Sequence, residues 1–309
     1  MIKTLLAFCL IVSCAHASHR VLMQGNGKLA IVEPDGHISW EMPWKGIHDI
    51  HVLENGNILT QRTMREVVEI ERKTKEVIWS YHAAKENGND GRKVEVHALQ
   101  PLKNGNIMLA ESGPARMIEI NREGEIVKEF KLKVDNPHPH TDTRLARKLE
   151  NGHYLVCHER DGTVREYDTE GGVVWEFPVP MFGKEPAKGH GLDAFGNKCF
   201  SAVRLPNGNT LIGTGNGHSV LEVTPQKEIV WKLHQDDLDG IRFAWVTTLE
   251  VLPNGNYVIG NCHAGPDNPL LVEIEPSSKK LVWKFDRYDV FGNSAPNSIL
   301  LNHLGESIR

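Results

Sequence analysis

Residues 49–62 read Asp-Ile-His-Val-Leu-Glu-Asn-Gly-Asn-Ile-Leu-Thr-Gln-Arg, two short apolar runs joined by Asn55-Gly56. Asn-Gly is a strong β-hairpin signal because both residues accept a positive φ. Val67–Glu71 and Glu76–Trp79 then supply two further strands, so this segment predicts a four-stranded antiparallel meander. No helical period is found along the chain, which favours an all-β fold.

The same turn recurs along the chain, at spacings of about 47 to 56 residues that are typical of four-stranded propeller blades. The turns are Asn55-Gly56, Asn104-Gly105, Asn151-Gly152, Asn207-Gly208 and Asn254-Gly255. Most units close on a tryptophan such as Trp79 or Trp175, and one reaches Phe130 instead. We interpret these aromatic residues as structural, packed between the outer strands of neighbouring blades.

Counting the units predicts a six-bladed β-propeller in a single domain, residues 18–309. With the strands of a blade lettered A to D from the axis outward, residues 20–44 hold strands B, C and D of a unit that lacks strand A. Five complete units follow, at 48–82, 96–132, 140–179, 198–234 and 245–286. Asn297–Leu301 is predicted to be the missing strand A. One blade built from both ends of the domain would then close the ring and remove the exposed sheet edges.

The first 17 residues are predicted to be an export signal. Lys3 precedes the apolar run Leu5–Val12, and Ala15-His16-Ala17 provides a small-x-small cleavage site. The segment Ile11–Cys14 also resembles a lipobox, which would leave a lipidated Cys14 at the mature N-terminus. The predicted location is therefore secreted or periplasmic, with a lipoprotein anchored at Cys14 as the alternative. No later segment has the apolar length of a membrane span.

Composition restricts the partners and the covalent chemistry. The chain carries 35 basic and 40 acidic residues, a net charge of −5, which argues against nucleic-acid binding. Beyond the predicted signal, the cysteines are Cys157, Cys199 and Cys262. Because their number is odd, at most one disulfide can form among them.

Candidate functional residues gather on one face of the predicted propeller. The D-to-A and B-to-C connections share one face, and the Asn-Gly turns mark the other. Since loops on a rigid scaffold commonly carry function, we predict a ligand site in the funnel of the first face. The predicted catalytic residues are His48, His97 and His190. The predicted ligand-binding residues are Arg62, Arg116, His140, Arg144, His158, His218, Arg242, Trp245 and His263.

These residue types point to an anionic ligand. Arginine binds carboxylate, sulfate or phosphate groups in a bidentate manner, Trp245 offers a ring for stacking, and histidine moves protons near neutral pH. The prediction is a protein that binds, and in its stronger version acts on, a carbohydrate or another sulfated or carboxylated small molecule. Two alternatives remain open: histidines from different blades holding a divalent metal, with no local ligand spacing to assign it, and a scaffold that binds other proteins.

Two segments carry a family resemblance. Asp35-Gly-His-Ile-Ser-Trp40 and Glu170-Gly-Gly-Val-Val-Trp175 resemble the PQQ-like (quinoprotein-type) propeller repeat, and Leu205–Ile212 is similar to units of bacterial arylsulfotransferases. The resemblance implies a propeller over the whole mature chain. The second family implies sulfuryl transfer through a histidine in Gly46–Ile50 or Gly189–Asp193. PQQ itself is not expected, because quinone-binding members commonly have an adjacent cysteine pair that this chain lacks, so no cofactor is predicted.

Overall fold

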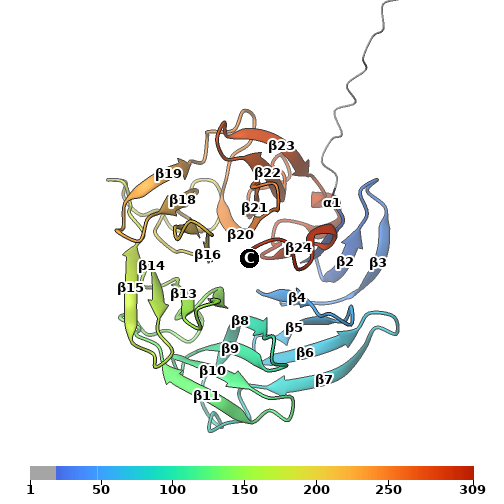
Figure 1. Cartoon of the computed structure of the whole chain (residues 1–309). Coiled ribbons are helices and arrows are strands. Elements are labelled where there is room, and N and C mark those ends of the chain that lie inside the picture. The colour runs from blue at the N-terminus through green and yellow to red at the C-terminus, as the bar shows by residue number, and fades with distance from the viewer. Residues whose placement is uncertain (1–18, 47) are drawn as a thin grey trace, which may run out of the picture.

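The computed structural model describes residues 19–46 and 48–309, and its strands form six four-stranded antiparallel sheets. The sheets stand around a central axis as the blades of a propeller (Figure 1), which confirms the predicted fold class. The predicted export signal, residues 1–17, with Cys14, lies outside the described residues. In the described part of the chain, no helix combines the length and the apolar character that crossing a membrane requires.

Each blade runs from an inner strand near the axis to an outer strand at the rim. In that order the blades contain β24 (Ser298–Leu300), β1 (Val21–Gly25), β2 (Lys28–Val32) and β3 (Ile38–Pro43); β4 (Ile50–Val52), β5 (Ile58–Thr63), β6 (Glu66–Glu71) and β7 (Glu76–His82); β8 (Glu95–Pro101), β9 (Ile107–Ser112), β10 (Arg116–Ile120) and β11 (Ile126–Lys131); β12 (Ala146–Lys148), β13 (Tyr154–His158), β14 (Thr163–Tyr167) and β15 (Val173–Pro178); β16 (Ser201–Arg204), β17 (Thr210–Gly213), β18 (Val220–Val223) and β19 (Ile229–Leu233); β20 (Trp245–Val251), β21 (Tyr257–Cys262), β22 (Leu271–Glu275) and β23 (Lys280–Phe285). A short helix α1 (Tyr288–Phe291) and a 3-10 turn η1 (Leu301–His303) complete the set.

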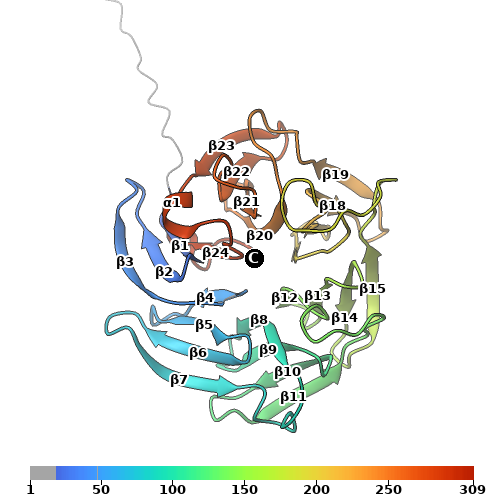
Figure 2. The same ribbon diagram turned by 180° about the vertical axis from the view of Figure 1, so that it is seen from behind.

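The ring closes through the C-terminal strand, as expected. Strand β24 pairs antiparallel with β1, with Val21 opposite Leu300. Beyond β24 the tail returns to the axis, where Ile308 and Val251 exchange backbone hydrogen bonds of 2.9 and 3.0 Å. The C-terminus therefore lies at the centre of the ring in both views (Figures 1 and 2).

The Asn-Gly hairpins form, but with a different turn from the one expected. Gly56 has φ of 82°, whereas the asparagines of these turns are not among the residues of positive φ. The Gly56 N–H bonds to the Leu53 carbonyl at 2.8 Å, and the Asn55 side chain accepts a bond from the backbone N–H of Asn57 at 3.0 Å. The turn is thus a four-residue turn that ends on a left-handed glycine, and only the glycine is needed for its φ.

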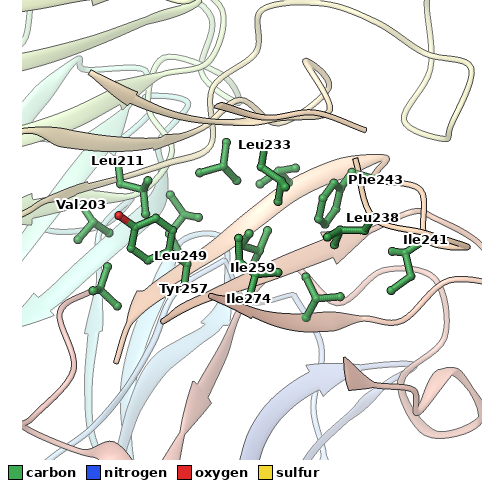
Figure 3. Close-up of a cluster of buried hydrophobic side chains, with 14 of the residues drawn as sticks. Val203, Leu211, Leu233, Leu238, Ile241, Phe243, Leu249, Tyr257, Ile259 and Ile274 are labelled. Carbon is green, nitrogen blue, oxygen red and sulfur yellow. The ribbon is translucent and has the colours of Figure 1, made fainter. Parts of the chain in front are cut away.

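Apolar side chains from adjacent blades form the core. The first two strands of a blade can be buried along their whole length, as β20 and β21 are, while outer strands such as β7 alternate between exposed and half-buried residues. Figure 3 shows one such interface, where Leu211 and Leu233 face Ile259 across neighbouring blades. Because each sheet buries both faces against other sheets, the propeller presents its loops, rather than its strands, to ligands.

Four outer-strand tryptophans bond to the blade that follows their own, which agrees with their structural interpretation. The indole N–H of Trp40 donates to the Arg72 carbonyl at 2.7 Å, and that of Trp231 donates to the Pro276 carbonyl at 2.9 Å. Trp79 and Trp175 make equivalent bonds to the following blade. In the part of the chain that the structure describes, the cysteines Cys157, Cys199 and Cys262 are buried free thiols.

Candidate ligand-binding site

A cavity of about 260 Å³ opens on the face formed by the D-to-A and B-to-C connections. Every blade except the one from β8 to β11 contributes to its wall. The lining residues are His48, His140, Thr141, Arg144, Glu159, His190, Lys198, Phe200, Trp245, Thr247, Cys262, His263, Ser294 and Pro296. Larger hollows of about 690 and 490 Å³ lie beside the Asn-Gly turns of the opposite face, and their walls contain no histidine. The chemistry of the central cavity, rather than its size, distinguishes it.

Two of the lining histidines, His48 and His140, contact His97 and Glu95 respectively, which pack beside the cavity without lining it. His48 lies two residues before β4, Glu95 and His97 lie at the start of β8, and His140 lies in the loop before β12. Glu95 Oε2 lies 3.1 Å from His97 Nε2 and 2.6 Å from His140 Nδ1. The Nδ1 atoms of His48 and His97 are in direct contact, with ring centroids 4.6 Å apart. Three blades thus supply one compact cluster.

Burial keeps part of this cluster uncharged. Removal from water lowers the pKa of His48 well below its ordinary value, and the neighbouring His97 and Arg144 lower it further. The pKa of His97 is also well below its ordinary value, first because of burial and then because of Arg144 and His140. Both rings are therefore neutral at pH 7, with a nitrogen lone pair available as a hydrogen-bond acceptor or a metal ligand.

The opposite wall is aromatic. The exposed His190 ring lies 4.8 Å from Trp245 and 5.1 Å from His263, measured between ring centroids. The Lys198 ammonium group lies 5.7 Å from the centre of the Trp245 ring. Burial, and then the neighbouring His190, lower the pKa of His263. Flat rings and a cation on one wall suit a ligand that combines a ring with a negative group.

Two cations and one carboxylate set the charge of the lining. The Arg144 side chain is buried and contacts Glu159, while Lys198 lies 3.5 Å from the other carboxylate oxygen of Glu159 and is 45 % exposed. Arg144 also donates to the His140 carbonyl and so holds the loop before β12 in place. Among the residues that line the cavity, the cations Arg144 and Lys198 outnumber the one carboxylate, Glu159, since Glu95 contacts His140 beside the cavity but does not line it.

The structure brings together seven of the predicted site residues and places the other five elsewhere. His48, His140, Arg144, His190, Trp245 and His263 line the cavity, and His97 contacts His48 from behind the wall. The residues that do not line it are Arg62, Arg116, His158, His218 and Arg242.

Those five side chains have partners of their own, most of them close by. The His158 ring is fully buried between the Asp142 carbonyl and the Tyr167 hydroxyl, each at 2.8 Å. Arg116 is buried against Glu111 and bonds Glu129 at 2.9 Å. His218 bonds the Phe243 carbonyl at 2.9 Å, Arg62 pairs with Glu66, and Arg242 lies 3.2 Å from Asp236. Their positions in the sequence place them on the face of the propeller where the cavity opens, but these contacts hold their side chains away from the cavity.

The sequence prediction missed Glu95, Lys198 and Phe200. Lys198 and Phe200 lie just before the inner strand β16, as His48 lies just before the inner strand β4. Their position before an inner strand was the signal that could have identified them. Glu95 lies two residues before His97, and alternation along a strand puts such residues on one face. A β-bulge between Val96 and Ala98 shifts the pairing register of this stretch with β9. The signal for Glu95 was therefore its spacing from a histidine that had already been selected.

Comparison with known proteins establishes the family and the fold. The model of the PQQ_2 family, described as outer membrane protein assembly factor BamB, matches residues 25–285, which agrees with the PQQ-like repeat expected from the sequence. No curated protein matches the chain in sequence.

Solved structures share the propeller fold at low identity. A protein of unknown function from Bacteroides caccae has a TM-score of 0.73 and 24% identity, and the match covers 91% of this chain and 98% of that one. A streptogramin B lyase has a TM-score of 0.56 and 12% identity, with 88% and 83% covered. A catalytically inactive virginiamycin B lyase from Staphylococcus aureus, solved with quinupristin, has a TM-score of 0.54 and 13% identity, with 89% and 86% covered. At these identities the likeness shows the fold alone.

Proposed function

We propose that this chain, which belongs to the propeller family described as outer membrane protein assembly factor BamB, binds a small anionic ligand in its central cavity. A propeller hosts many functions, so the proposal rests on the site rather than on the fold. The observation that carries it is the charge of the lining. Arg144 and Lys198 outweigh Glu159 there, although the whole chain has a net charge of −5.

The size and the wall of the cavity limit the ligand further. A volume of about 260 Å³ is below the roughly 300–1,000 Å³ typical of sites for drug-sized molecules, so the ligand is a single sugar or one small ring. The exposed His190 ring, backed by Trp245, offers a flat surface for that ring. The Lys198 ammonium group can bind a carboxylate or sulfate oxygen beside it. A uronic acid, a sulfated monosaccharide or an aryl sulfate has the required chemistry.

Sulfuryl transfer is a second candidate, favoured by the neutral state of His48. A neutral imidazole is a nucleophile, and burial lowers the pKa of His48 so that the ring is uncharged. Its nitrogen would attack the sulfur of an aryl sulfate, and the S–O bond to the ring would break. The phenolate that leaves would take a proton from water, and the second imidazole nitrogen would release its proton to water. A second phenol would then take the sulfo group from the histidine. Arg144 and Lys198 would stabilise the transferred oxygens.

Export of the chain is part of the same proposal. Residues 1–17 carry the apolar run and the cleavage site, and Cys14 the alternative lipid anchor. Mass spectrometry of the chain purified from its source should give a mature N-terminus at Ser18, or a lipidated one at Cys14. A full-length chain that begins at Met1 would contradict export on this segment.

The binding proposal is tested by a melting screen of the purified protein with glucuronate, a sulfated galactose, an aryl sulfate and the neutral parent sugars. A ligand that binds only the folded state stabilises it by about 2.7 kcal/mol at a concentration of 100 times its Kd. We expect the anionic compounds, and not the neutral ones, to raise Tm by several degrees. Release of the phenol from the aryl sulfate would identify sulfuryl transfer.

Two lysine variants locate the binding. Lys198→Met removes the cation of the cavity but keeps an apolar stem, and Lys188→Met changes an exposed lysine in the same loop that does not line the cavity. The shift should vanish in Lys198→Met and in His190→Ala and persist in Lys188→Met. If no compound shifts the wild-type Tm, the small-ligand proposal is wrong, and a scaffold that binds other proteins is then the favoured function.

A further inference from the structure

We propose that Glu95, His97 and His140 bind a divalent transition metal ion, such as Zn²⁺, in the wall of the central cavity. One ligand atom from each of these residues lies within 4.8 Å of the others. The side chains come from the start of β8 and from the loop before β12, so two blades hold them independently. The proposal does not depend on anion binding, because it uses neither Lys198 nor the rings around Trp245.

The three ligand atoms are close to metal-binding geometry. Glu95 Oε2 lies 3.1 Å from His97 Nε2 and 2.6 Å from His140 Nδ1. Bonds of about 2.0–2.2 Å to zinc place neighbouring ligand atoms of a tetrahedron about 3.3–3.6 Å apart. The two distances to Glu95 would therefore change by a few tenths of an ångström to about one ångström, and the distance between the two histidine nitrogens, at most 4.8 Å, would shorten by up to about 1.5 Å. Two histidines with one carboxylate are also a common ligand set of catalytic zinc and of iron(II).

A second, independent observation is a buried nitrogen of the cluster that has no hydrogen-bond partner. His97 is fully buried, and among the described residues its Nε2 has no hydrogen-bond partner, although Glu95 Oε2 is only 3.1 Å away. The separation is short, but the direction is wrong for a hydrogen bond. Since buried polar atoms nearly always have a partner, this nitrogen needs an explanation. A metal ion that uses its lone pair supplies one.

The surroundings of His97 favour that role. Its other ring nitrogen, Nδ1, contacts Nδ1 of His48, and a hydrogen bond there would leave Nε2 deprotonated and ready for a metal. Such outer contacts orient and tune the metal-ligating histidines. His48 is itself held in place, because its backbone N–H donates to the buried Gln61 side chain at 3.2 Å.

The proposed ion would keep an open position toward the cavity. Three protein ligands leave the fourth tetrahedral position for water or for a ligand oxygen. His140 lines the cavity and its side chain is 48 % exposed, so the ion would be accessible from that side. The cavity would then present a Lewis acid on the wall opposite the His190–Trp245 rings.

The test is metal binding by the full-length, untagged protein after dialysis against a chelator. We expect calorimetry to give one equivalent of Zn²⁺, and Co²⁺ to give the intense visible absorption of a four-coordinate ion. Glu95→Gln removes a ligand charge without changing shape, and His140→Ala removes a half-exposed ligand. Each should weaken Zn²⁺ binding at least 100-fold. His48→Ala should weaken it about 10- to 100-fold, as loss of an outer-shell partner does.

The matched control is His37→Ala. His37 makes a histidine–carboxylate contact of 2.6 Å with Asp35 on the surface. It is not one of the proposed ligands, so its loss should leave Zn²⁺ binding unchanged. Circular dichroism and Tm of each variant check the fold. Sub-stoichiometric binding, or binding that survives Glu95→Gln and His140→Ala, would overturn the proposal. Anion binding is measured on the same metal-free preparations, so either proposal can fail alone.

Discussion

At the residue scale, the acidic residue that recurs in the third strand of the blades has a structural task. The Glu69 carboxylate accepts bonds from Asn57 at 2.7 Å and Asn55 at 3.3 Å in its own blade, and contacts Arg122 of the next blade. Glu222 and Glu273 accept equivalent bonds from Asn209 and Asn256 at 2.6 Å. The repeated asparagine turn and the repeated glutamate are therefore two halves of one contact on the face opposite the cavity.

These contacts predict how stability responds to acid. Burial alone would raise the pKa of Glu69, but the hydrogen bonds from Asn57, Arg122 and Asn55 outweigh it, so its pKa lies below the ordinary value. The ionised form is thus favoured in the folded state. The contribution of the ionised Glu69 to the free energy of unfolding is complete above the pKa of a glutamate in the unfolded chain, about 4.3. It is lost as pH falls through the lower pKa of Glu69 in the folded protein.

We therefore expect Glu69→Gln to reduce the free energy of unfolding by about 1–3 kcal/mol at pH 7 and by less at pH 3. Urea unfolding at both pH values measures the difference. Glu76→Gln, an exposed glutamate on β7, is the control and should change little. An equal loss for Glu69→Gln at both pH values would show that the carboxylate charge is irrelevant.

The sequence predicted the histidines at strand starts because that placement follows from topology alone. His48, His140 and His190 could be assigned to one face without coordinates. What the sequence could not supply is which side chains reach the axis. His158 has a hydroxyl partner in Tyr167, and the contact between His48 and His97 joins residues of different blades. Such contacts depend on the packing of whole sheets, which the local pattern does not contain.

At the element scale, the three-residue strand β24 completes the first blade. Ile299 and Leu300 are buried on opposite faces of the blade, Ile299 with Leu22 and Leu300 with Val21. The segment Asn297–Leu301 was predicted to do this, and the observed strand is Ser298–Leu300. Its position was predictable because a blade without an inner strand leaves an open edge. The turn type of the hairpins was not, because the Asn-Gly pair is compatible with more than one turn.

Loss of side-chain packing in β24 should destabilise the whole domain. Leu300 is 0% exposed, and Leu→Ala at buried positions costs about 2–5 kcal/mol. We expect Leu300→Ala to lower the free energy of unfolding by that amount, measured by urea denaturation. Leu304→Ala, at a leucine that is 44% exposed just beyond the strand, should remain within about 0.5 kcal/mol of wild type. Similar losses in both variants would mean that β24 does not hold the ring closed.

At the scale of the whole molecule, side-chain contacts join the blades around the rim. Trp40, Trp79, Trp175 and Trp231 each donate to a carbonyl of the following blade. Where the chain has Phe130, the ring packs on Tyr154 of the next blade instead, with centroids 4.9 Å apart. Trp283 meets His19 at 4.7 Å across the closure. Every interface between blades therefore has an aromatic link at its outer edge, and a blade cannot unfold without breaking its neighbours' contacts.

This continuity predicts that the ring unfolds as one unit. Trp40 and Trp231 belong to β3 and β19, in blades that are separated by the blade from β20 to β23 (Figure 1), and Trp→Phe removes a hydrogen bond worth about 0.5–1.5 kcal/mol at each. Because the sites share no neighbours, their effects in the double variant should add to within about 0.5 kcal/mol, and calorimetry should show a single transition. If the double variant unfolds in two transitions, the blades melt separately, since the two weakened interfaces would then divide the ring into a part of two blades and a part of four. A single transition with additive losses of free energy would show instead that all six blades form one cooperative unit. The closure by β24 and the rim contacts would then stabilise that same unit, which also holds the walls of the cavity in place.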